Sequence, residues 1–316
     1  MKTILAVAYI LTTALFISYN SDTIVTSVKA AVNGENGLYK SWGLDSLDAE
    51  NLDNISNDYF KADHTGEGVT VYIIDGGIGE TESTSTPLYS KDFTSEATPF
   101  ESKCYNHGTM MGSAISGKTT GVAKNATIVD LKAITCVEEN SQGSYAYDAL
   151  KWIADNHDGS PAIVNMSLSI DGEYPEMETI VEVLKQKNIP VFAAAANNSN
   201  DACLTVLPRI ESVITVGGYK HEGGKIQLSD VSSYGSCVDI LAPAQGVNAV
   251  NAEGKGVYAS GTSMATAYAS GVAALYLEEN PNSTVDELKN WLYSNSLHYS
   301  VKEDTTDKIL HIPTGY

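Results

Sequence analysis

Runs of consecutive apolar residues recur along the chain from residue 69 onward. The first run, residues 69–74 (VTVYII), has almost no polar position, which is typical of a strand buried on both faces of a sheet. The same character recurs in residues 127–134, 162–168, 190–196 and 213–217. These segments predict the buried strands of one sheet.

Segments with helical periodicity lie between and after these runs. Residues 263–277 are small and apolar on almost every side, which predicts a buried helix. Ser283 and Thr284 are both candidate N-caps for the last predicted helix. The four helical patterns cover residues 144–154, 177–187, 263–277 and 284–297.

This alternation of strands and helices predicts an α/β fold. A mostly parallel sheet with right-handed crossovers and helices on both faces follows from it. No repeat of fixed period and no low-complexity linker divides the chain, which favours a single domain. In such a sheet the functional groups gather at the carboxyl ends of the strands.

The N-terminus carries a separate signal. An apolar run at residues 4–17 follows Lys2 and precedes a polar stretch. A first core helix is the alternative, but the polar stretch has no core pattern to join. We predict a signal peptide at residues 1–20 with an uncertain end, a short leader or propeptide at 21–37, and the folded domain at 38–316. The signal peptide predicts a secreted, extracellular protein, and no later segment is apolar enough to span a bilayer.

Charge narrows the choice of partners. The chain has 39 acidic and 19 basic residues, a formal net charge of −20. Such a surface repels phosphate backbones, which excludes nucleic acid as a main partner, and it disfavours anionic membranes. The simplest interpretation of the acidic charge is that it keeps the protein soluble. Attraction of basic substrates is a second interpretation, without local support.

Three motifs contain residues typical of nucleophilic catalysis. They hold Asp75 in VYIIDGGIG, His107 in NHGTMMGSAISG and Ser263 in SGTSMATAYASG. Taken singly, Asp75 is better interpreted as a turn residue, His107 as a structural histidine and Ser263 as a helix N-cap. Taken together, a carboxylate, an imidazole and a hydroxyl form the set that activates a serine nucleophile, in the chain order of subtilisin.

These motifs resemble those of the subtilisin-like serine proteases, and within them the proteinase K and aqualysin branch. That family has Asp-Thr-Gly, His-Gly-Thr-His and Gly-Thr-Ser-Met-Ala, where this chain has DGG, HGTM and GTSMA. The resemblance runs from about Trp42 to about Leu277. It implies a single-domain serine endopeptidase, acting as a monomer on protein or peptide substrates, with no cofactor required for the chemistry.

The resemblance also implies the rest of the site. It makes Asn197 the side-chain donor of an oxyanion hole, with the Ser263 backbone N–H as second donor. A substrate strand is expected to lie between two edges and beside a pocket wall. The first edge consists of Ser141, Gln142 and Gly143, and the second of Ser167, Leu168 and Ser169. The pocket wall consists of Ala194, Ala195 and Ala196.

The four cysteines fit an oxidising compartment, and free buried thiols are the alternative. Of three pairings, the resemblance implies Cys104–Cys136 and Cys203–Cys237. It also makes Asp239, with the carbonyls of Glu211 and Val213, a candidate site for structural calcium. Only one carboxylate is evident there, and the flanking loop departs from the family.

Several positions depart from the family pattern. Gly76 replaces a threonine, Met110 a histidine, and Ala267 and Tyr268 a Pro-His pair. Ala196 and Ser169 replace glycines at the specificity pocket, which suggests a narrowed pocket that favours small residues.

One alternative to an active enzyme remains open. Too few residues precede Trp42 for a folded propeptide of domain size. With the altered glycines, this motivates an inactive homologue that binds peptides or acts as an interaction protein. A nucleotide-binding α/β protein lacks any supporting glycine motif.

Sequons at Asn54, Asn125 and Asn282 predict a glycoprotein in a eukaryotic secretory route. Asn165 and Asn197 also fit the sequon, but their expected places in a strand and an oxyanion hole argue against modification.

Overall fold

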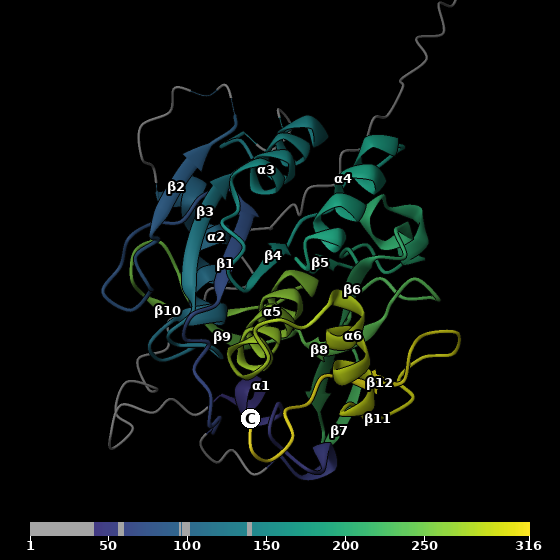
Figure 1. Cartoon of the computed structure of the whole chain (residues 1–316). Helices are drawn as coiled ribbons and strands as arrows, with labels where there is room; N and C mark the ends of the chain where they lie inside the picture. The colour runs from purple at the N-terminus through teal and green to yellow at the C-terminus, as the bar shows by residue number, and fades with distance from the viewer. Residues whose placement is uncertain (1–40, 56–59, 95, 97–101, 138–140) are drawn as a thin grey trace, which may run out of the picture.

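A ten-stranded sheet forms the centre of the protein in this computed structural model (Figure 1). The structure describes residues 41–316 except 56–59, 95, 97–101 and 138–140. The predicted signal peptide and leader lie outside the described residues. The strand order is β11-β12-β8-β6-β5-β4-β1-β3-β2, with β7 paired to β6.

The sheet is parallel from β2 to β12, as predicted, and antiparallel only where β7 and β11 join it. A separate antiparallel pair is formed by β9 and β10. The strands are β1 Thr70–Asp75, β2 Tyr89–Asp92, β3 Thr127–Lys132, β4 Ala162–Met166, β5 Val191–Ala194, β6 Val213–Glu222, β7 Lys225–Leu228, β8 Ile240–Pro243, β9 Val247–Val250, β10 Gly256–Ala259, β11 Leu297–His298 and β12 Lys308–Ile309.

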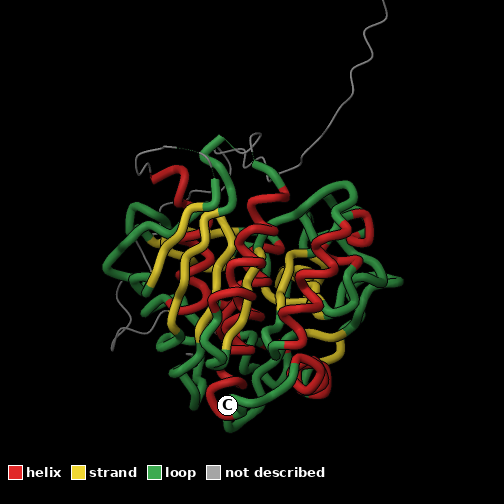
Figure 2. Tube along the Cα trace, turned by 45° about the horizontal axis from the view of Figure 1, so that its top comes forward, coloured by secondary structure: helices red, strands yellow, loops and turns green. Residues whose placement is uncertain are grey.

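Helices cover both faces of the sheet, which confirms the predicted α/β class (Figure 2). Successive residues of β1 alternate between the faces: Val71 and Ile73 join the core under α2 and α5, whereas Tyr72 and Ile74 join the core under α3 and α4. The helices are α1 Trp42–Asp45, α2 Ser102–Ser116, α3 Gly143–Asn156, α4 Pro175–Gln186, α5 Thr262–Glu279 and α6 Val285–Ser294. Short 3-10 turns cover Leu52–Asn54, Ala202–Leu204 and Leu207–Arg209.

The predicted buried helix is α5, whose residues from Thr262 to Leu277 are all buried. Gly271 lets it pack closely, because a Cβ there would lie 2.7 Å from Val122. Thr284 caps α6 through a reciprocal capping box with Glu287. The predicted end of α6 at Leu297 was wrong, because Leu297 pairs with Ile309 as a strand.

The register of the parallel strands places residues that are far apart in the sequence at the same height in the sheet. In the parallel pair of β1 and β4, Ile73 lies opposite Asn165. Two residues further along each chain, Asp75 and Ser167 therefore leave the sheet side by side at the carboxyl ends of their strands. Among the described residues, no helix combines the length and the apolar character that crossing a bilayer requires.

Candidate active site

Asp75 and His107 form a hydrogen-bonded pair at the carboxyl edge of the sheet. Both carboxylate oxygens of Asp75 lie 2.9 Å from His107 Nδ1. Asp75 is fully buried at the end of β1, and the His107 side chain is 21% exposed. This contact fixes the ring orientation and directs Nε2 away from the carboxylate.

His107 lies inside α2. The helix packs against the turn that follows Asp75. The Gly76 N–H donates to Asp75 Oδ1 at 2.6 Å, and the Gly79 N–H donates to Thr109 Oγ1 at 2.8 Å. A Cβ on Gly108 would collide with the Gly77 carbonyl oxygen, so glycine permits this close approach.

Ser263 is the second residue of α5 and is held against the end of β4. Its Oγ donates to the Ser167 carbonyl at 3.1 Å, and Ser167 Oγ donates to the Ser263 carbonyl at 2.9 Å. Because Ser167 and Asp75 end neighbouring strands, these bonds bring the start of α5 to the edge that carries Asp75 and His107. Helices α2 and α5 also pack directly on one another.

Asn197 lies beside the start of α5, with its amide orientation fixed. Its Oδ1 accepts from the backbone N–H of Thr262 at 2.8 Å and from the Thr262 hydroxyl at 3.0 Å. The whole amide lies close to Gly261, where a Cβ would be 3.3 Å from Nδ2 and 3.5 Å from Oδ1. Gly261 has φ +141°, a conformation that side chains disfavour.

A buried polar network supports Ser167 and was not foreseen from the sequence. Asn165 Nδ2 donates to Ser167 Oγ, and Ser270 Oγ donates to Asn165 Oδ1, both at 3.0 Å. All three side chains are buried. The glycosylation sequon at Asn165 was the only signal of an unusual residue, and it indicated nothing about this network.

The two predicted substrate edges lie close together. Gly143 packs against Ile170, since a Cβ on Gly143 would be 3.3 Å from its Cγ2. Gln142 is extended, but Gly143 begins α3 and does not continue the edge. Ser141 Oγ accepts from the Thr135 N–H at 2.9 Å, which holds this segment to the loop after β3.

Residues 194–196 continue β5 as a buried wall beside Asn197, and Ala196 within it is strained. It has φ +82°, in the left-handed region where a Cβ is unfavourable. Its carbonyl accepts from the Ser233 N–H at 2.9 Å, which fixes the peptide in place. The alanine therefore occupies a backbone conformation suited to the glycine it replaces.

Both disulfides that the resemblance implied are present, Cys104–Cys136 and Cys203–Cys237. The first joins α2, three residues before His107, to the loop after β3. Among the described residues no cysteine is free.

The residues around Asp239 do not fit a calcium ion. Lys289 Nζ donates to the carbonyls of Glu211 at 2.9 Å and Val213 at 3.5 Å, the two oxygens expected to bind the metal. Asp239 accepts from the Thr215 N–H at 2.8 Å and from the Tyr293 hydroxyl at 2.9 Å. Burial, then the facing carboxylate of Asp239, holds the pKa of Tyr293 far above its usual range, so it stays a donor. The Lys289 ammonium group thus already donates to the two carbonyls. Calcium would also need further oxygen ligands.

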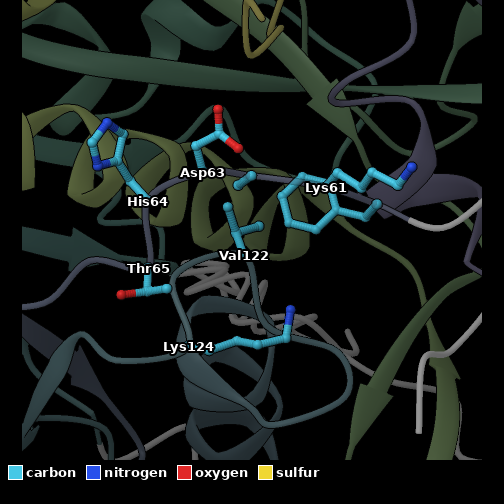
Figure 3. Close-up of a pocket in the computed structure, with 8 residues that line it drawn as sticks. Lys61, Asp63, His64, Thr65, Val122 and Lys124 are labelled. Carbon is cyan, nitrogen blue, oxygen red and sulfur yellow. The ribbon is translucent and has the colours of Figure 1, made fainter. Parts of the chain in front are cut away.

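A separate cavity of about 380 Å³ lies at the opposite ends of the strands. Figure 3 shows the residues that line it. Its walls are segments that precede β1 and β3, so it is at the amino ends of the strands. Its lining residues are Phe60, Lys61, Ala62, Asp63, His64, Thr65, Val122 and Lys124. It is therefore not part of the site that contains Asp75 and His107.

A doubly covered parallel sheet with an aspartate–histidine pair and a helix-start serine at its carboxyl edge is an arrangement typical of α/β serine hydrolases. A family model described as the subtilase family matches residues 66–316. The chain belongs to this family.

Curated relatives and a solved structure agree with this assignment. The chain is 33% identical over 271 residues to the alkaline serine exoprotease A of Vibrio alginolyticus, covering 85% of this chain and 48% of the relative. It is 33% identical over 256 residues to an extracellular serine proteinase of Thermus sp. strain Rt41A, covering 80% and 60%. The chain therefore spans less than two thirds of these relatives. The crystal structure of a cold adapted subtilisin-like serine proteinase matches with TM-score 0.77 and 33% identity, covering 85% of this chain and 97% of that one.

Replacing Ala196 with glycine is expected to stabilise the fold. Glycine adopts φ +82° without steric strain, so the free energy of unfolding should rise by up to about 1 kcal/mol in denaturant titrations. Ala195→Gly is the matched control, because Ala195 is equally buried and lacks a positive φ. This control should lose stability, and equal losses in both variants would contradict the strain at Ala196.

Removal of divalent cations is expected to leave the Asp239 region intact. EDTA should have the same effect on the melting temperature of the wild type and of Asp239→Asn, whereas Lys289→Met should lower the free energy of unfolding by about 1 kcal/mol. Lys185→Met removes a surface pair with Asp286 and should change little. A melting temperature that falls with EDTA and recovers with calcium in the wild type, but not in Asp239→Asn, would contradict this interpretation.

Proposed function

We propose that this protein is a secreted serine endopeptidase that hydrolyses peptide bonds through Ser263, His107 and Asp75. The observation that carries the proposal is the hydrogen bond between the buried Asp75 carboxylate and His107 Nδ1, at the sheet edge where Ser263 Oγ is held. The family assignment supports it independently.

In the proposed first step, His107 Nε2 takes the proton of Ser263 Oγ while this oxygen attacks the carbonyl carbon of the peptide bond. The hydroxyl turns from the Ser167 carbonyl toward the imidazole. Asp75 holds the ring with Nδ1 protonated and stabilises the imidazolium that forms. The imidazolium then gives its proton to the leaving amine, and an acyl-enzyme remains on Ser263.

Water completes the reaction by the same route in reverse. His107 removes a proton from water, the hydroxide oxygen attacks the ester carbon, and Ser263 Oγ leaves with the proton returned by His107. Each step passes the proton through one imidazole. No cofactor is needed in this scheme.

The negative oxygen of each tetrahedral intermediate is proposed to bind Asn197 Nδ2 and the Ser263 N–H. Thr262 holds Asn197 Oδ1 from two sides, so that Nδ2 is oriented before substrate arrives. A donor fixed in advance needs no reorganisation during the reaction, and loss of one such donor typically lowers kcat by about 10²–10³-fold.

The substrate is proposed to lie extended between residues 141–142 and 167–169, with the side chain before the cleaved bond against residues 194–196. Backbone pairing of this kind gives affinity for many sequences. Ala196 and Ser169 add side-chain atoms to walls that glycine leaves bare. We therefore propose a narrowed pocket that accepts small side chains.

Secretion is proposed from three observations. The apolar run at residues 4–17 has signal-peptide character, the two disulfides fit an oxidising compartment, and the Thermus relative is named as extracellular. All proposed catalytic groups come from one chain, which is consistent with action as a monomer.

Covalent labelling tests the nucleophile. A fluorophosphonate probe should label the wild-type protein at Ser263, while Ser263→Ala should remain unlabelled and lose at least about 10⁴-fold in kcat/KM. Ser300→Ala changes an exposed serine and should label like the wild type. A folded wild-type protein that stays unlabelled would contradict the proposal and favour a non-catalytic, peptide-binding role.

A library of peptide substrates tests the pocket. Alanine, serine or glycine before the cleaved bond should give kcat/KM about tenfold or more above phenylalanine or tyrosine, because bulky side chains meet the added atoms. Ala196→Gly combined with Ser169→Gly should reduce this preference. A wild-type preference for phenylalanine or tyrosine would contradict the narrowed pocket.

A further inference from the structure

A second buried carboxylate, Asp130, lies near Asp75 on the neighbouring strand and has no place in the mechanism above. It lies on β3, opposite Ile73 of β1 and Ser90 of β2. Its residue is 4% exposed. An ionised aspartate buried near a second buried aspartate is costly unless it is paired or hydrogen-bonded.

Asp130 contacts the turn that connects Asp75 to α2. Its Oδ2 accepts from the Ile78 N–H at 3.2 Å. The same turn packs against α2, because a Cβ on Gly77 would lie 2.6 Å from the Tyr105 ring. The turn is therefore held by Asp130 on one side and by the helix that carries His107 on the other.

The groups around Asp130 do not neutralise it. Burial raises the pKa of Asp130 to about 7, the Ile78 N–H and the Ser90 hydroxyl oppose this shift, and the negative charges of Asp75 and Asp92 add to it. Tyr105 faces it from α2, where burial, then Asp92 and Asp130, raises the pKa of this phenol.

Lys132 follows Asp130 by two residues on β3, and its charge is directed to other groups. Its Nζ lies 3.5 Å from Asp92 and 3.6 Å from Glu96, and it donates to Thr94 at 3.0 Å. An ionised Asp130 thus adds negative charge near Asp75, the partner of His107.

We propose that Asp130 is a positioning residue for His107, which anchors the turn after Asp75 and sets the pH above which the enzyme becomes active. This inference rests on the proposed function, in which His107 acts only when neutral. A nearby negative charge favours the imidazolium, so an ionised Asp130 delays the loss of the His107 proton to higher pH.

The test measures kcat/KM against pH for the wild type and Asp130→Asn, with a neutral peptide substrate and active sites counted by the fluorophosphonate probe. Wild-type activity should fall below roughly pH 6–7. In Asp130→Asn the midpoint of this fall should move to lower pH by about half a unit or more, because the buried charge is lost. The plateau at high pH should drop no more than about threefold. The shift should persist in 1 M NaCl, since salt screens buried charges weakly.

Two further variants make the result decisive. Asp92→Asn is the matched control, because that carboxylate is 40% exposed and its removal should shift the midpoint much less, and hardly at all in 1 M NaCl. Asp130→Ala is made in parallel, so that poor folding of one variant leaves the test intact. Its midpoint should move the same way.

Failure of this inference is distinguishable from failure of the proposed function. Profiles of the Asp130 variants that superimpose on the wild type, or that fall equally at every pH, would overturn the role of Asp130 while labelling persists. Absence of labelling in the wild type would instead reject the peptidase itself.

Discussion

The parallel pairing of β1 with β4 is the constraint on which the rest of the site depends. Because Ile73 lies opposite Asn165, Asp75 and Ser167 leave the sheet at one level. Asp75 binds His107 directly, and Ser167 exchanges two hydrogen bonds with Ser263. A shift of this register by one residue would turn each side chain to the other face of the sheet and separate the two halves of the site.

Small residues let α2 and α5 pack closely against their neighbours. Gly108 permits α2 to approach the turn after Asp75, and Gly271 permits α5 to lie against Val122. The apolar surroundings of α5 make its few polar atoms expensive unless each has a partner. Ser270 donates a hydrogen bond to Asn165, and Asn165 donates one to Ser167. This network fixes the segment that holds Ser263 in place.

The sequence predicted five of the strands and the buried helix because each had a local signal. Apolar runs identified β1 and β4, and the motifs around Asp75, His107 and Ser263 named the chemistry through resemblance. The contacts of Asp130, Asn165 and Lys289 had no such signal. Asp130 is one polar residue in a strand pattern, and Lys289 lies on an ordinary amphipathic helix. Their partners are up to about a hundred residues away, which local periodicity cannot indicate.

Lys289 and Ala196 show how a family site tolerates local change when the backbone is held from elsewhere. An ammonium group can replace a metal ion at the Glu211 carbonyl because it supplies positive charge and donors without requiring six or more oxygen ligands. Ala196 keeps a conformation suited to glycine because β5 pairs with β6 just before it and the Ser233 N–H binds its carbonyl. In both places the sheet fixes the backbone first, and the side chain adapts to it. The position of Asn197, which directly follows Ala196, is therefore maintained by strand pairing and by Thr262, although the residue before it is strained.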